Sequence, residues 1–459
     1  MQVDVLVLEW TSQLTRDRLV STLISNYLKF MGCEVFDGPL QNGMVCIDSY
    51  KPKVLLLVNT IGSKTAIEIA MYAKKRGVIV VSLFGEGNFT KDRIQQFVWG
   101  HNKKQRQIDD YRFVWSQRAQ KLINSSYPKL KDTTFYSGSV GADNYIMNNT
   151  CIASLKKAYP KLQEENKVII GVGCWNFCLL NPKDHRYEGF KNAVGDKEFN
   201  RLKYDGTLFN NELSKLVKER QDVVFLIKEH PHKSDFEGAS GIDGLEVFEN
   251  VIVVDKDTPI IDCINISDVW LTYESTTAFE AWLSGTPTGL LNPTGVNFLT
   301  DWRAPVYKGQ PNFDSADSWG DAIDYFGLHK SLPGFSELSS IREELLEDVF
   351  GHSDGLNHVR VGNLVLDILS GKKKEILRCN SGCLITDILK SRIKGFVWSF
   401  NQLINKVGLK LPKILARFSV REWNKEFLIQ YQLKTMDKQK EFYAGHELNK
   451  KDLSVITYE

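Results

Sequence analysis

Polar side chains follow one apolar run of the sequence at the point where a strand would have to stop. Residues 223–227 are apolar, and Lys228, Glu229 and His230 come directly after them. Pro231 lacks a backbone N–H and cannot continue a strand, so it would hold His230 at the edge of a sheet. A histidine there can donate to a phosphate oxygen and stabilise the charge on a leaving nucleotide. For an isolated His-Pro pair, a histidine that bonds only to backbone is the simpler interpretation.

A second polar group follows residues 268–273, where Ser275, Thr276 and Thr277 stand at the expected start of a helix. Ser275 or Thr276 is a good N-cap, and Glu280 lies close to a capping-box position. The same helix start offers N–H groups, hydroxyls and the positive end of the helix dipole, which together can bind an anion. Capping and phosphate binding therefore compete as explanations, and both can hold. Glu280 could reach a ribose hydroxyl.

Glu86 is the third candidate, and it stands between Gly85 and Gly87 after another apolar run. The flanking glycines let the backbone turn sharply and approach a ligand closely. A carboxylate at that position could take a proton from an incoming hydroxyl group. The alternative is a turn carboxylate that caps the next helix.

The elements that carry these three groups are predicted to form two α/β domains. Apolar runs alternate with amphipathic helices over residues 1–145 and again over 165–373, a pattern typical of βαβ units with parallel sheets. In doubly wound sheets, functional residues lie at the carboxyl ends of the strands. Two sheets that face each other would bring the three groups to one central cleft. Gly173, which ends the first strand of the second domain, belongs to the same set.

The composition is that of an ordinary globular chain. Its 459 residues carry a net charge of +2, which argues against a protein that coats nucleic acid. No apolar run is long enough to span a membrane, and the first residues lack a signal-peptide pattern, so we expect a cytoplasmic protein. Eight cysteines are scattered, and two pairs have C-x3-C spacing without the histidine partners of common zinc modules. Reduced thiols are the preferred interpretation, and we expect neither a metal nor a cofactor.

Three short segments carry a resemblance to a known family. GEG (85–87), KEHP (228–231) and YESTTAFEAWLSGTP (273–287) resemble the acidic-Gly, His-Pro and Ser-Ser/Thr motifs of bacterial sialyltransferases and of related capsule and surface-carbohydrate transferases. These enzymes are glycosyltransferases of the GT-B type that use CMP-activated acidic sugars. The resemblance covers roughly residues 1–370. It implies two Rossmann-like domains facing a cleft, a nucleotide-sugar donor (CMP-sugar favoured) and a glycan or glycolipid acceptor.

The resemblance also implies residue roles. Glu86 matches the general base that acts on the acceptor hydroxyl, and His230 matches the histidine that contacts the donor phosphate and assists CMP departure. Ser275 and Thr276 match the hydroxyl pair that binds the same phosphate. The sequence departs from the family pattern at Gly85, where the family has a first acid, and in its Ser-Thr-Thr run. The other residues assigned to donor binding are Lys228, Glu229, Thr277, Glu280 and Gly173.

The expected function is therefore an inverting, metal-independent glycosyltransferase. It would move a CMP-linked acidic sugar, such as a nonulosonic acid or Kdo, onto a surface glycan or a lipid-linked acceptor. Three alternatives remain: a sugar-nucleotide epimerase of the same fold, a polyol-phosphate transferase of the CDP-glycerol type, and a non-catalytic subunit recruited to a membrane. The long segment after Gly173 could cover the site through Trp175, His185 and Arg186, or could be a mobile surface loop.

Residues 384–418 form a basic amphipathic segment within a predicted helical extension, 380–459. Apolar residues recur with a helical period, and seven Lys or Arg stand against the single acidic residue Asp387. Pro412 would break or kink this helix. Such a segment can lie in an anionic membrane interface, which would make the protein peripheral on the inner face of the cell membrane. The alternative is a stripe that packs on the protein's own surface or on a partner subunit.

Overall fold

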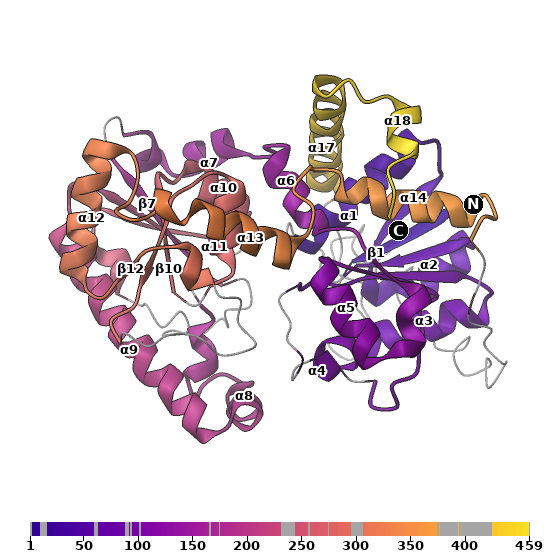
Figure 1. Ribbon diagram of the computed structural model, residues 1–459, viewed down its shortest axis with the longest axis horizontal. Helices are drawn as coiled ribbons and strands as arrows, with labels where there is room; N and C mark the ends of the chain where they lie inside the picture. The colour runs from indigo at the N-terminus through magenta and orange to yellow at the C-terminus, as the bar shows by residue number, and fades with distance from the viewer. Residues whose placement is uncertain are drawn as a thin grey trace, which may run out of the picture. The chain divides into compact units, whose positions relative to one another are not determined.

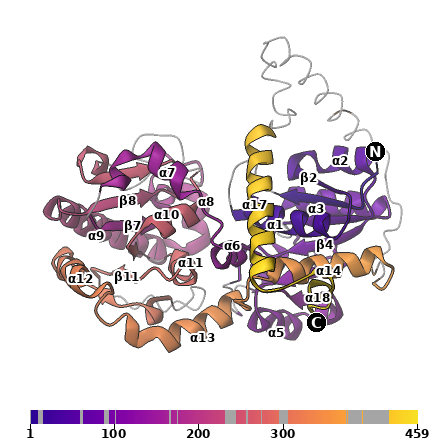
Figure 2. The same cartoon turned by 90° about the horizontal axis from the view of Figure 1, so that it is seen from above.

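The structure is a computed structural model of the chain. It describes residues 2–9, 16–58, 63–87, 91, 94–100, 102–164, 167–173, 175–230, 244–255, 258–273, 275–294, 306–373, 376, 393 and 425–458. The chain divides into two compact units, Met1–Met147 with Glu347–Glu459, and Asn148–Leu346. Each unit contains one six-stranded sheet (Figures 1 and 2).

The first sheet has the strand order β2-β1-β3-β4-β5-β6, with all neighbours parallel. Its strands are β1 (Val5–Glu9), β2 (Val35–Pro39), β3 (Val54–Leu57), β4 (Ile79–Leu83), β5 (Tyr111–Val114) and β6 (Thr134–Tyr136). The α-helices of this unit are α1 (Arg16–Phe30), α2 (Gly43–Tyr50), α3 (Lys64–Lys75), α4 (Ile94–Trp99), α5 (Gln117–Ser126), α6 (Asp143–Ile146), α14 (Asn357–Leu369), α17 (Lys425–Gly445) and α18 (Lys450–Ser454).

Helices cover both faces of the first sheet, which is why its inner strands β1, β3 and β4 are mostly apolar. Successive side chains of a strand point to opposite faces. Val5 and Val7 of β1 pack in one core with residues of α1 and α14, whereas Leu6 and Leu8 pack in another with residues of α2 and α3. The sheet is therefore wound on both sides.

The second sheet has the order β12-β11-β10-β7-β8-β9, again all parallel. Its strands are β7 (Ile169–Gly173), β8 (Val224–Lys228), β9 (Val251–Val254), β10 (Val269–Thr272), β11 (Thr288–Leu291) and β12 (Asn312–Phe313). Its α-helices are α7 (Ile152–Ala158), α8 (Tyr187–Val194), α9 (Asp196–Glu219), α10 (Ile260–Ile266), α11 (Thr277–Leu283) and α12 (Ala316–His329), while α13 (Ser339–Phe350) crosses into the first unit. The two parallel sheets with flanking helices confirm the predicted pair of doubly wound domains.

Two segments differ from the sequence-based expectation. The edge strand β2 was not predicted, because Asp37, Gly38 and Pro39 interrupt its apolar run; an edge strand tolerates proline since one of its sides has no neighbour. The long segment after Gly173 is not a structureless loop, because it contains a 3-10 helix, η5 (Phe177–Leu180), and the helix α8.

The C-terminal helices pack with the first sheet. The predicted domain 165–373 places α14 with the second sheet, but α14 contacts α1 and β3, and α17 lies beside α1 (Figures 1 and 2). A buried network joins them: His358 Nδ1 lies 2.7 Å from Asp143 Oδ2, and His358 Nε2 lies 2.5 Å from Tyr443 Oη. Residues 425–458 thus complete the first unit.

The basic segment 384–418 lies outside the described residues, apart from Ile393. Within the part of the chain that the structure describes, no helix is long and apolar enough to cross a membrane.

Candidate functional site

Three neighbouring strands of the second unit end at one level of the sheet. Gly173, the last residue of β7, pairs with Lys228 at the end of β8 and with Thr272 at the end of β10. His230 lies two residues after the end of β8, and Ser275 lies two residues before the start of α11. The carboxyl edge of this sheet therefore carries the residues that the sequence assigned to the donor. We call these strand ends the second-unit edge.

Gly173 has no room for a side chain. A Cβ atom there would lie 2.6 Å from Thr277 Oγ1 and 3.1 Å from Trp270 Nε1. Trp270 Nε1–H donates to Thr277 Oγ1 at 2.9 Å, and the hydroxyl oxygens of Ser275 and Thr277 are 2.8 Å apart. Gly173 thus lets the start of α11 approach the end of β7. The Trp270 indole fixes the Thr277 hydroxyl group, which is the side-chain group nearest to Gly173.

Helix capping explains part of the Ser-Thr-Thr run. Thr277 N–H donates to Ser275 Oγ at 3.2 Å, so this serine serves the helix start. Thr276 occupies the N-cap position, but its exposed side chain makes no capping hydrogen bond. Glu280 is 9 % exposed and lies in the first turn of α11. A contact of Glu280 with a ribose stays a prediction.

Lys228 joins the ends of two strands. Its side chain is buried, and Nζ donates to the carbonyl oxygens of Glu229 at 3.1 Å and Asp255 at 3.4 Å. Burial raises the pKa of the Cys263 thiol to about 12, and the nearby Lys228 ammonium offsets part of that rise. Glu229 and His230 follow the strand as half-buried residues, and their ligand roles stay predictions.

The candidate metal ligands in the sequence are residues that the structure describes only in part. Metal independence was expected because no Asp-x-Asp motif was recognised, but residues 255–257 read Asp-Lys-Asp, a carboxylate spacing that can hold a divalent ion. Asp257 lies outside the described residues, as does one cysteine or both in each C-x3-C pair. Among the described residues, no group of three His, Cys, Asp or Glu side chains is arranged to hold a metal ion.

The segment after β7 is braced internally. Arg186 donates from Nε and Nη2 to the carboxylate of Asp184 and from Nη2 to Cys178 Sγ at 3.0 Å. The hydrogen bond to Asp184 raises the pKa of Arg186. The His185 side chain is 83 % exposed, and Trp175 packs against Phe177 and Phe190. Arg186 therefore braces this segment, and ligand contacts of Trp175, His185 and Arg186 stay predictions.

In the first unit, Glu86 is exposed on a loop that directly follows β4, and Trp115 holds that loop in place. Trp115 Nε1–H donates to the carbonyl oxygen of Phe84 at 2.8 Å. A Cβ atom on Gly87 would lie 2.3 Å from the Trp115 ring, so the indole packs directly on this glycine. Arg118 Nη2 also donates to the Gly87 carbonyl oxygen at 3.4 Å. The loop that presents Glu86 is thus fixed on both sides of it.

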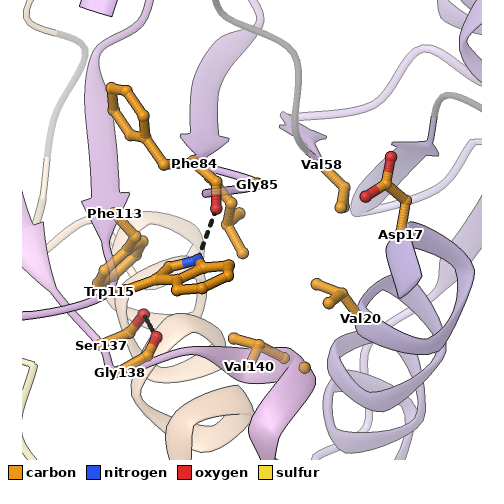
Figure 3. A pocket seen from close by; sticks show the side chains of 12 residues that line it. Asp17, Val20, Val58, Phe84, Gly85, Phe113, Trp115, Ser137, Gly138 and Val140 are labelled. Carbon is orange, nitrogen blue, oxygen red and sulfur yellow. Dashed lines mark hydrogen bonds between the residues drawn. The ribbon is translucent and has the colours of Figure 1, made fainter. Parts of the chain in front are cut away.

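A pocket lies at this same carboxyl edge of the first sheet (Figure 3). Trp115 and Phe113 form one side of it, and Val20 and Val58 form the other. Asp17, in the first turn of α1, is the charged residue of the lining and is 9 % exposed. Asp17 and Trp115 were not predicted from the sequence as pocket residues. Their signals were a carboxylate at the start of the first helix and an indole directly after β5.

Comparisons with known proteins identify the fold. No protein-family model and no curated protein sequence matches the chain. Among solved structures, a protein from Listeria monocytogenes assigned as a UDP-N-acetylglucosamine 2-epimerase shares 12 % identity, with a TM-score of 0.52 over 84 % of this chain and 100 % of its own. The chain has the GT-B fold.

Two further solved structures are similar to the chain in fold. A second UDP-N-acetylglucosamine 2-epimerase has 13 % identity and a TM-score of 0.52, covering 83 % of this chain and 100 % of its own. The wall teichoic acid polymerase TagF has 13 % identity and a TM-score of 0.49, covering 80 % of this chain and 89 % of its own. At such identities the likeness establishes the GT-B fold alone.

Proposed function

We propose that the protein is a nucleotide-sugar-dependent glycosyltransferase. The observation that carries this proposal is the contact of Gly173 with Thr277 at the second-unit edge. A strand that ends in glycine leaves its backbone open to a ligand, and the adjoining hydroxyls of Ser275 and Thr276 offer hydrogen-bond donors to phosphate oxygens. His230, which follows the neighbouring strand, supplies a further donor.

The chemistry divides between the two sheets. A glycosyl phosphate leaves through an oxocarbenium-like state, so catalysis needs donors for the leaving phosphate and a base for the acceptor hydroxyl. His230, Ser275 and Thr276 take the first task and Glu86 takes the second. The motif resemblance favours a CMP-linked acidic sugar as donor and a surface glycan or lipid-linked glycan as acceptor. Direct displacement by the acceptor inverts the configuration at the transferred carbon.

Protection against thermal unfolding tests the donor assignment. CMP-, CDP- and UDP-linked sugars are compared, and one nucleotide class is expected to raise the melting temperature, since a ligand at 100 times its Kd stabilises by about 2.7 kcal/mol. Thr276→Val and His230→Asn should reduce this protection. Glu86→Gln should keep it but lower the transfer rate by about 10²–10⁴-fold, because the base is lost and the donor site is not. Undiminished transfer by Glu86→Gln would contradict the proposal.

Product analysis separates the rival activities. A glycosyltransferase releases nucleotide only in step with acceptor glycosylation, whereas an epimerase converts the donor without any acceptor. A polyol-phosphate transferase would also release CMP, but the phosphate would appear in the product. Transfer that stops in EDTA and returns only with a divalent ion would show that the reaction depends on a metal ion and would contradict metal independence.

A further inference from the structure

The last turn of α13 lies against the loop that carries Glu86. A Cβ atom on Gly87 would lie 2.7 Å from the carbonyl oxygen of Val349 and 2.3 Å from the Trp115 ring. On the helix side, the ring centroids of Trp115 and Phe350 are 5.1 Å apart. Val349 and Phe350 are both buried. The Trp115 indole therefore contacts both the loop and the helix, and Gly87 leaves room for this packing.

The end of α13 is itself fixed in the first unit. Gly351, which follows the helix, has a φ of 78°, a left-handed conformation that residues with a Cβ atom rarely adopt. A Cβ atom there would lie 2.2 Å from the carbonyl oxygen of Trp115. Ser139 N–H donates to the carbonyl oxygen of Phe350 at 2.7 Å. The end of the helix thus has one position against the residues that follow β5 and β6.

Arg118 joins the helix to the loop. Its Nε lies 2.7 Å from Oδ2 of Asp348 in α13, and its Nη2 donates to the carbonyl oxygen of Gly87 at 3.4 Å. The side chains of Arg118 and Asp348 are 30 % and 42 % exposed, and ion pairs exposed to this extent contribute little to stability. A guanidinium is planar and presents its N–H groups in a fixed fork. Arg118 therefore sets the distance between α13 and the residue after Glu86 while adding little to the stability of the fold.

We propose that the last turn of α13 positions the proposed base, with Arg118 and Asp348 as the positioning residues. The inference rests on the role of Glu86 in the proposed function. A general base must lie within hydrogen-bond reach of the proton that it takes, and a misplacement of about 1 Å can lower a rate about 10²-fold. Glu86 is exposed, so the fixed backbone on either side of it defines where its carboxylate can reach.

Helix α13 carries this contact because of its place in the chain. The helix begins at Ser339 in the second unit and ends at Phe350 in the first. Near its start, Arg342 Nη1 donates to the carbonyl oxygens of Gly309 at 3.1 Å and Phe335 at 2.6 Å. The chain that returns from the second unit therefore completes the support of the Glu86 loop, and residues 1–147 alone lack part of that support.

Variants of the ion pair test the inference in the full chain. Arg118→Met keeps the apolar stem but no N–H group, and Asp348→Ala removes the acceptor. We expect kcat for transfer to fall at least about tenfold with an unchanged KM for the nucleotide-sugar donor, because only the base is displaced. Melting temperatures should stay within about 4 °C of the unsubstituted protein. Arg118→Lys should recover only part of the rate, since an ammonium group lacks the fork.

Arg76→Met is the matched control. Arg76 Nη2 lies 2.8 Å from Oδ1 of Asp48 in the same unit, and the side chains of this pair are 33 % and 30 % exposed. The pair joins the end of α3 to α2, so its loss should leave the Glu86 loop and the transfer rate as they were. Transfer by Arg118→Met and Asp348→Ala at the rate of Arg76→Met would overturn the inference.

Limited proteolysis reports the position of the loop without any need for activity. A glutamate-specific protease cleaves after Glu86 when the loop opens, and mass spectrometry identifies that product. The cleavage rate should be at least about fivefold higher in Arg118→Met than in Arg76→Met. Equal rates in the two variants would overturn the inference.

The two readouts separate this inference from the proposed function. Faster cleavage in Arg118→Met together with undiminished transfer by Glu86→Gln would support α13 as the element that fixes the loop and would contradict the role of Glu86 as base. Transfer that is lost in Glu86→Gln but kept in Arg118→Met would support the proposed function and overturn the inference.

Discussion

Gly173 is the residue on which the second-unit edge most directly depends. A methyl group at this position would meet Thr277 Oγ1 at 2.6 Å and Trp270 Nε1 at 3.1 Å, so the start of α11 would have to move away from β7. We expect Gly173→Ala to lower stability by about 1–3 kcal/mol through overpacking. The same displacement should weaken donor protection at least about tenfold, because the hydroxyls move. Urea unfolding and ligand-dependent melting measure the two effects.

Gly189→Ala is the matched control for that prediction. Gly189 lies within α8, and a Cβ atom there would have nothing within 4 Å. This alanine should stabilise the chain by about 0.5–1 kcal/mol, since glycine is a poor helix residue. Gly173→Ala combined with Thr277→Ala should recover stability but not donor affinity. Unchanged donor affinity in Gly173→Ala alone would show that the edge does not bind the donor.

The sequence predicts which residues are candidates for the site but not the contacts that they make. Ser275, Thr276 and Gly173 could be predicted to share an edge, because parallel strands end together and the runs before them were apolar. The contact of Gly173 with Thr277 could not be predicted, since it joins residues about one hundred positions apart through the packing of one helix. Asp17 was not predicted for a different reason. A carboxylate at the start of a helix usually stabilises the helix dipole, so its position alone does not indicate a pocket.

At the scale of elements, the loop that carries Glu86 depends on β5 and the residues after it. Trp115→Phe keeps an aromatic ring against Gly87 but removes the N–H that donates to the Phe84 carbonyl oxygen at 2.8 Å. We expect a loss of about 0.5–1.5 kcal/mol in stability. The transfer rate should fall while the KM for the nucleotide-sugar donor stays near its original value, because the base loses its position and the second-unit edge is untouched. Steady-state kinetics against donor concentration measures the split.

Trp99→Phe serves as the matched control for the loop variant. Trp99 is also buried in the first unit, but its Nε1–H has no hydrogen-bond partner among the described residues. Removing that N–H leaves Glu86 and its loop as they were, so the transfer rate should hold. A rate that falls equally in both variants would mean that Trp115 acts through general stability and not through the loop.

The elements themselves could be predicted where local pattern decides them. Long apolar runs gave β1, β3, β4, β7 and β8, because strands covered on both faces need no polar residues. Strand β2 was hidden by Asp37 and Gly38, and Asp37 is satisfied by tertiary partners, since Gln432 Nε2 donates to it at 3.1 Å. Helix α14 was predicted as part of the second domain, because an amphipathic face does not show which sheet it will cover.

The whole molecule depends on its last helices, which changes how membrane binding should be tested. Truncation after Lys373 would remove α17 and α18 together with the basic segment 384–418. Gln439 Nε2 donates to the Leu23 carbonyl oxygen at 2.9 Å, and Tyr443 and Leu453 are buried against the first unit. A truncated chain should therefore unfold at a markedly lower temperature. Loss of vesicle binding by this chain could result from its unfolding, so it would not show that residues 384–418 bind the membrane.

Replacement of residues 384–418 by a Gly/Ser linker of equal length avoids this difficulty. The replaced chain keeps residues 425–458 and the network of Asp143, His358 and Tyr443, so its melting temperature should match that of the full chain. The full chain should float with vesicles that contain phosphatidylserine and the replaced chain should not, because seven basic side chains and an apolar stripe are lost. High salt should weaken flotation of the full chain, since the attraction to anionic lipid is screened. If the replaced chain floats as well as the full one, the segment packs elsewhere and the acceptor need not lie at a membrane.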